Sequence, residues 1–92
     1  MSALGTGNGG AEITFTLSAR ATVQADVLHI AGLAVQRPVT NRVLTAGTNS
    51  LHWNGRSISG MQVLVGRYVI RITASSEDGQ QLSRIGTVNI KR

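Results

Sequence analysis

Apolar and polar side chains alternate with a period of two along most of this chain. The alternation is clearest over residues 11–18 and 22–30. Because successive side chains of a β-strand point to opposite faces of the sheet, this period predicts strands with one buried face. Weaker versions of the pattern predict strands over residues 34–39, 42–44, 48–53, 67–75 and 81–91. No segment shows a helical period, and residues 57–64 have room for one helical turn at most.

Glycine and proline separate the predicted strands. Turns are expected where glycine follows a small or acidic residue, at positions 31–32, 46–47 and 78–79. Pro38 ends the predicted strand 34–39, since proline cannot donate a backbone hydrogen bond to a central strand. Ile85 and Gly86 interrupt the alternation of residues 81–91, which predicts a bulge there.

Short strands punctuated in this way are typical of an all-β domain. We expect an immunoglobulin-like or fibronectin-type-III-like sandwich of two antiparallel sheets with about seven strands. A small closed barrel is the alternative. The lone Trp and the lone Tyr flank a loop that contains three glycines, and large aromatic side chains there predict a core linking two neighbouring strands. The predicted core comprises Phe15, Val27, Trp53, Tyr68, Ile70 and Ile72.

The length of 92 residues suits one domain. Residues 1–10 are rich in glycine and are predicted to form a flexible leader or linker, which leaves residues 11–92 for the sandwich. The segment carries neither the basic nor the apolar region of a signal peptide. The glycine-rich start favours a piece of a longer exported chain, so we expect an extracytoplasmic location, secreted or at the cell surface. No stretch is long and apolar enough for a membrane-spanning helix.

Candidate chemical groups are few and scattered. Cysteine is absent, which excludes disulfides, thiolate nucleophiles and zinc sites built on cysteine. The two histidines, His29 and His52, and the four acidic residues form no catalytic or metal-binding pattern. The glycine loop lacks the Gly-Lys-Ser/Thr ending of a phosphate-binding loop. We therefore expect no enzyme activity, no cofactor, no metal and no small-molecule substrate.

The chain is basic, with a formal net charge of +5. Arg67 and Arg71 lie four residues apart on one predicted strand and share its outer face, and Arg56 and Lys91 extend that surface. A basic stripe is typical of binding to acidic polysaccharide or nucleic acid. Nucleic acid is disfavoured because all three aromatic residues are predicted to point inward, away from any base. A solvated basic face without a ligand is the other interpretation.

Apolar residues also occupy the loop between the Trp and Tyr strands. Ile58, Met61 and Leu64 either fold over the end of the sandwich or remain exposed as an interface. With Arg56, Arg67 and Arg71, they form the candidate protein interface. The edge strands offer a second route to a partner, because their unpaired backbone groups can accept a further strand.

Several short motifs resemble the FlgD immunoglobulin-like family, small domains of the flagellar hook-capping protein and of other bacterial exported proteins. The resemblance covers about residues 11–91 and rests on Phe15-Thr16-Leu17-Ser18, Trp53-Asn54-Gly55-Arg56, Gly60, Val63 and Gly66-Arg67-Tyr68. The chain is also similar to the C-terminal sorting domains of type IX secretion cargo. The resemblance implies a non-catalytic module for attachment, spacing or assembly, with domains of the parent chain or a second copy as partner. A C-terminal secretion or sorting domain is the alternative, and a basic module for acidic polymers is a third.

Overall fold

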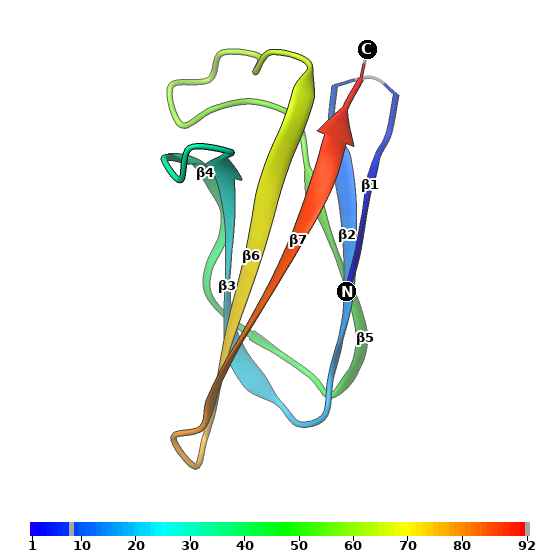
Figure 1. Cartoon of the computed structure of the whole chain (residues 1–92). Helices are drawn as coiled ribbons and strands as arrows, with labels where there is room; N and C mark the ends of the chain where they lie inside the picture. Colours follow the sequence, from blue (N-terminus) through cyan, green and yellow to red (C-terminus); the bar gives the residue numbers. More distant parts are fainter. Residues whose placement is uncertain (8, 92) are drawn as a thin grey trace.

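The computed structural model describes residues 1–7 and 9–91, which form seven strands in two antiparallel sheets (Figure 1). Asn8 of the predicted leader and Arg92 of the predicted domain lie outside the described residues. The strands are β1 (Ser2–Gly5), β2 (Ala11–Leu17), β3 (Ala21–His29), β4 (Ala34–Leu44), β5 (Gly47–Trp53), β6 (Gly66–Ser76) and β7 (Gln81–Ile90). One sheet has the order β1-β2-β5 and the other β4-β3-β6-β7. The described residues contain no helix, and the predicted all-β, immunoglobulin-like sandwich is confirmed.

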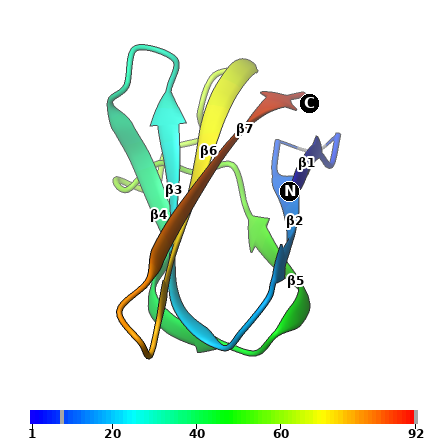
Figure 2. The same cartoon turned by 60° about the horizontal axis from the view of Figure 1, so that its bottom comes forward.

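The core lies between the two sheets, which face each other in Figure 2. Every second side chain of β2, β3 and β6 points into it, as the period-two pattern predicts. The residues expected in the core are all buried there, namely Phe15, Val27, Trp53, Tyr68, Ile70 and Ile72.

β4 differs from its prediction. The two short strands expected at 34–39 and 42–44 form one strand of 11 residues, which continues through Pro38. This continuation is possible because β4 is the edge of its sheet, so the missing N–H of proline breaks no central ladder. The pairing with β3 shifts register three times, and Asn41 adopts a positive φ of 51°.

The bulge predicted in β7 is wrong. β6 and β7 pair without a register shift from Gly66↔Ile90 to Ser75↔Gln81. Gly86 has another role there: a Cβ at this position would lie 2.6 Å from the terminal methyl carbon of Met1. The glycine therefore leaves space for the first side chain of the chain.

The N-terminal segment also differs from its prediction, because Ser2–Gly5 form β1 and pair with residues 11–14 of β2. Its glycines allow close packing. A Cβ on Gly5 would overlap the carbonyl oxygen of Asn89, and one on Gly10 would lie 2.6 Å from the carbonyl oxygen of Trp53. Sequence reasoning missed the strand because Ala3 is its only side chain that packs against the core. A linker role for residues 1–10 stays a prediction.

Candidate functional site

Two buried aromatic rings hold the loop between β5 and β6. The rings of Trp53 and Tyr68 pack edge to face, with centroids 5.8 Å apart. The Trp53 Nε1 donates a hydrogen bond of 2.9 Å to the carbonyl oxygen of Arg56, and the Tyr68 hydroxyl donates one of 2.7 Å to that of Leu64. Both ends of the loop are thus anchored by side chains of the strands that it connects.

The loop is further ordered by contacts with itself and with β4. The Arg56 guanidinium donates to the carbonyl oxygen of Gly60 at 2.9 Å, and the Val63 side chain is buried. Across the loop, the Ile58 N–H donates to the carbonyl oxygen of Val35 in β4 at 3.0 Å. The loop therefore lies against the start of β4, beside the turn that joins β3 and β4 (Figure 1).

This ordered loop leaves apolar side chains in solvent. Ile58, Met61 and Leu64 are 68%, 70% and 80% exposed. The sequence left two interpretations open, a loop folded over the end of the sandwich and an exposed loop, and the structure shows these three side chains exposed. Other large apolar residues of the same loop and of the β3–β4 turn are exposed too. We call the whole group the apolar end; it consists of Ile30, Leu33, Ile58, Met61, Leu64 and Val65.

The candidate arginines do not form one stripe of uncompensated charge. Arg71 donates to the Asp26 carboxylate at 3.1 Å and 3.3 Å, and Arg37 lies 3.4 Å from the other carboxylate oxygen. Arg56 turns back into its own loop, while Arg67 is exposed on the outer face of β6. The row of unpaired cations expected of a phosphate-binding stripe is thus interrupted at Arg71, whose charge is paired with Asp26.

Asp26 is a structural residue that sequence reasoning treated as one of four scattered acids. It is 1% exposed although it lies on the outer face of its sheet, because Arg37, Arg71 and the Gln24 amide cover it. The signal that could have revealed it is the antiparallel register, in which Asp26 of β3 lies directly opposite Arg71 of β6.

The histidines are placed apart. The His52 Nδ1 lies 2.8 Å from a carboxylate oxygen of Glu12 on the exposed face of the smaller sheet. The His29 ring packs edge to face against Tyr68 and accepts a hydrogen bond from the Ala31 N–H. Within residues 1–7 and 9–91, no group of three or more His, Cys, Asp or Glu side chains is placed to hold a metal ion. These same residues include no helix with the length and apolar character needed to cross a membrane.

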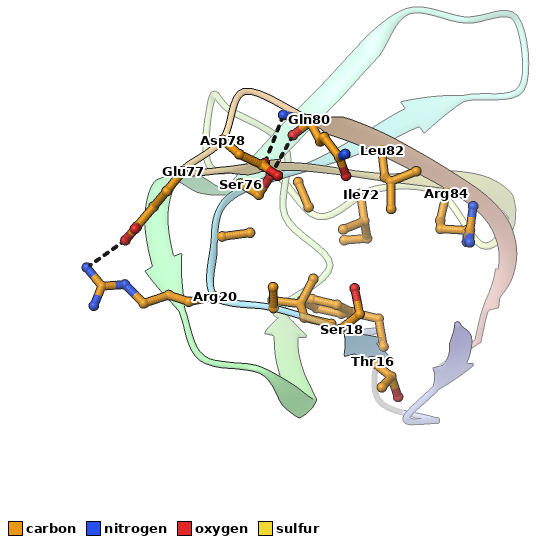
Figure 3. A pocket seen from close by; sticks show the side chains of 15 residues that line it. Thr16, Ser18, Arg20, Ile72, Ser76, Glu77, Asp78, Gln80, Leu82 and Arg84 are labelled. Carbon is orange, nitrogen blue, oxygen red and sulfur yellow. Dashed lines mark hydrogen bonds and ion pairs between the residues drawn. The ribbon is translucent and has the colours of Figure 1, made fainter.

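A second feature, which the sequence did not reveal, lies at the opposite end of the sandwich. The sheets part there around a cavity of about 730 Å³ between β2, β6 and β7 (Figure 3). Its lining includes Phe15, Ile72, Leu82 and Arg84. Leu82 and Arg84 continue the inward-facing alternation of Val88 and Ile90, and reading β7 without a bulge would have placed them in the interior.

The rim of this cavity holds the one clear pKa shift among the described residues. The Ser76 hydroxyl donates to the Asp78 carboxylate, and the Gln80 backbone N–H donates to it at 3.3 Å. These hydrogen bonds favour the charged form and lower the pKa of Asp78 below its ordinary value of 3.8, with Ser76 as the larger cause. The carboxylate thereby stabilises the β6–β7 turn.

Comparison with solved structures identifies the same sandwich in other proteins. FlgD from Pseudomonas aeruginosa superposes with a TM-score of 0.72 at 22% identity, covering 88% of this chain and 59% of FlgD. The chain resembles FlgD in fold. FlgD from Xanthomonas campestris, whose structure is described as giving insights into the hook capping essential for flagellar assembly, gives a TM-score of 0.73 at 20% identity, covering 96% of this chain and 61% of that one.

A further structure shares the architecture. CopC from Methylosinus trichosporium OB3b has a TM-score of 0.61 at 14% identity and covers 98% of this chain and 85% of its own. No protein-family model and no curated protein matches the chain. The chain spans about 60% of the FlgD structures that it resembles. At these identities the likeness establishes the fold, which confirms the FlgD-like sandwich expected from the sequence motifs.

Proposed function

We propose that this domain is a non-catalytic accessory module of a bacterial exported or surface protein, which attaches to a protein partner through the apolar end. The observation that carries the proposal is the exposure of Ile58, Met61 and Leu64 on a loop that hydrogen bonds from Trp53 and Tyr68 anchor at both ends. A rigid apolar surface loses little conformational entropy on binding, which favours association.

The composition of the apolar end fits a protein interface. Large apolar patches on soluble domains are typically sites of protein or membrane interaction. Met61 adds a side chain that adapts to irregular partner surfaces. Arg67, exposed at the start of β6 two residues after Val65, supplies a polar rim of the kind that surrounds interface cores. A second copy of this domain, or another domain of the parent chain, is the partner that we favour.

The FlgD likeness supports this proposal at the level of fold. The structure of the Xanthomonas protein is described as giving insights into the hook capping that is essential for flagellar assembly. A sandwich used in protein assembly elsewhere is compatible with a module for attachment, spacing or assembly here.

Self-association provides the direct test. Static light scattering over a concentration series is expected to show oligomers of the unmodified domain, which Ile58→Ser combined with Met61→Ser removes. Ile85→Ser is the matched control, because Ile85 is also 68% exposed but lies in β7, away from the loop. A domain that stays monomeric at about 1 mM, where associations of about −4 kcal/mol become visible, would contradict the self-association form of the proposal.

A further inference from the structure

The outer edge of β5 is regular and unpaired. β5 ends the sheet of order β1-β2-β5, so no strand of the described residues pairs with its second side. Its 7 residues pair one for one with residues 11–17 of β2, without a register shift. Residues 47–53 contain no proline and, apart from His52, no acidic or basic residue. We call the backbone of residues 48–52 on this second side the β5 edge.

The edge strand of the larger sheet on the same side is protected against pairing. β4 contains Pro38, carries Arg37 and Arg42, and shifts register three times against β3. Proline, charged side chains and irregular pairing are the usual means by which proteins prevent an edge strand from accepting another. The β5 edge has none of these features, so it is the more suitable template for an added strand.

The place beside the β5 edge is that of a fourth strand of the smaller sheet. β1 and β7 adjoin along one side of the sandwich, where the backbone of Gly5 lies against the Asn89 carbonyl oxygen. The remaining edges, β5 and β4, therefore lie along the other side. Only residues 45–46 separate these two strands in the chain, so their connection supplies no strand. The smaller sheet thus has three strands against four, and β4 is left without a facing strand.

The inner face of β4 carries an unpaired cation beside an apolar side chain. Arg42 lies opposite the buried Val23 in the register with β3, and residues directly opposite share a face. Arg42 is exposed, and no carboxylate of the described residues pairs with its guanidinium. Leu44, on the same face opposite Ala21, is only partly buried against the core. A strand added to the β5 edge would meet both side chains.

We propose that an extended segment of a partner protein adds to the β5 edge as a fourth strand, with an acidic residue that pairs with Arg42. The segment runs antiparallel to β5, because antiparallel pairing is the more stable kind. Arg42 lies near the end of β4, which is joined to the start of β5. The acidic residue therefore lies near the C-terminal end of the segment, opposite Asn49.

The pairing also fixes which side chains of the segment point inward. Residues opposite Asn49 and Leu51 lie on the inner face, where Leu51 is buried, and are expected to be acidic and apolar, respectively. Residues opposite Thr48, Ser50 and His52 lie on the outer face beside small or polar side chains. The partner backbone satisfies the free N–H and C=O groups of the β5 edge, and the alternate side chains provide specificity.

Charge favours a different protein over a second copy as the source of the strand. The formal net charge of +5 makes two copies of the domain repel each other. The β5 strand of a second copy would also bring no acidic residue to Arg42. An acidic segment gains on both counts. This inference goes beyond the proposed function, which uses the apolar end, and the two stand or fall separately.

The test uses the synthetic peptide acetyl-Val-Thr-Val-Thr-Glu-Thr-amide. Its first, third and fifth residues are designed to lie opposite Trp53, Leu51 and Asn49. Titration into the isotopically labelled domain is expected to give saturable NMR shift changes at residues 48–52 and 39–44, with a dissociation constant below about 1 mM.

Charge variants test the contact with Arg42. Arg42→Glu is expected to weaken peptide binding at least about tenfold and to favour the peptide that carries Lys in place of Glu. Arg67→Glu makes the same charge change on the outer face of β6 and is expected to leave binding unchanged. Both arginines are exposed, so unchanged melting temperatures are expected to show that the two variants are folded.

Backbone-methylated peptides test the pairing itself. Successive N–H groups of a strand point to opposite sides, so methylation of the Thr nitrogens removes the donors on one side of the peptide. Methylation of the Val and Glu nitrogens removes those on the other side. One methylated peptide is expected to bind like the parent peptide, and the other at least about tenfold more weakly.

The proposal is overturned by the absence of saturable binding, by equal weakening in the two charge variants, or by equal affinity of the two methylated peptides. The Ile58→Ser and Met61→Ser double variant is expected to be monomeric and to bind the peptide normally. Loss of peptide binding in it would place the peptide at the apolar end. A dimer of this double variant that Ser50→Lys dissociates would assign the β5 edge to a second copy instead. Peptide binding by an unmodified domain that stays monomeric would refute only the self-association through the apolar end.

Discussion

Replacing Trp53 by Ala tests the central packing of the sandwich. Trp53 is 2% exposed, packs edge to face on Tyr68, and donates a hydrogen bond to the Arg56 carbonyl oxygen. The substitution removes all three contributions and leaves a cavity between the sheets. We expect it to lower the free energy of unfolding by about 3–5 kcal/mol, as truncation of large core side chains does.

The hydrogen bond is the smaller part of this loss. The Arg56 carbonyl oxygen also lies 3.4 Å from the Gln36 amide nitrogen, so it retains a partner when the indole is removed. A single neutral hydrogen bond contributes about 0.5–1.5 kcal/mol, and here we expect the lower half of that range. Packing and the aromatic contact, worth about 0.5–1.5 kcal/mol beyond the buried area, account for the rest.

Urea unfolding at 25 °C measures the effect. A domain of 92 residues typically has a stability of roughly 5–14 kcal/mol, so Trp53→Ala is expected to remain measurable or to unfold outright. Trp53→Phe separates the terms, because it retains a ring against Tyr68 but loses the indole N–H and some volume. We expect a loss of about 1–2 kcal/mol for this variant.

Two outcomes would refute this reasoning. A midpoint of Trp53→Ala close to that of the unmodified domain would mean that the indole is not part of the packed interior. A loss for Trp53→Phe equal to that for Trp53→Ala would assign the stability to the hydrogen bond, against the magnitudes given above.

Three further substitutions test individual contacts. Gly55→Ala is expected to lower the free energy of unfolding by more than about 3 kcal/mol, because the new Cβ would overlap the Gly9 backbone. Gly60→Ala is the control: Gly60 has a similar positive φ of 87° but open space around it, so we expect a loss of only about 1 kcal/mol. Equal urea midpoints for the two variants would contradict the contact with Gly9. Asp26→Asn is expected to lower the free energy of unfolding by about 1–3 kcal/mol. This is less than the loss for a fully buried ion pair, because the arginines that cover Asp26 reach solvent, and a loss below about 0.5 kcal/mol would show that the carboxylate is dispensable. Asp78→Asn is expected to be less stable than the unmodified domain at pH values above 3.8, the pKa of Asp78 in the unfolded chain. The difference in stability is expected to vanish as the pH falls through the lowered pKa of the folded domain. A difference in thermal unfolding that does not depend on pH would exclude the carboxylate charge as its cause.

The sequence was sufficient for the architecture because the architecture depends on periodicity. Alternation over β2, β3 and β6 reports which side chains face the core, and the aromatic residues at the ends of β5 and β6 report which strands the loop connects. The same reasoning failed at β1, whose position depends on backbone pairing and on close approach to Asn89 and Trp53. Glycines that permit such contacts look the same in sequence as glycines of a linker.

The candidate sites were less predictable, because they depend on which strands are adjacent. Alternation placed Arg71 on an outer face but did not reveal that β3 would set Asp26 opposite it, so its charge appeared free. The cavity of about 730 Å³ is a second case, since Leu82 and Arg84 line it only because β7 pairs with β6 without a bulge. A site that depends on which strands are adjacent and on their register therefore cannot be located from the alternation within one strand.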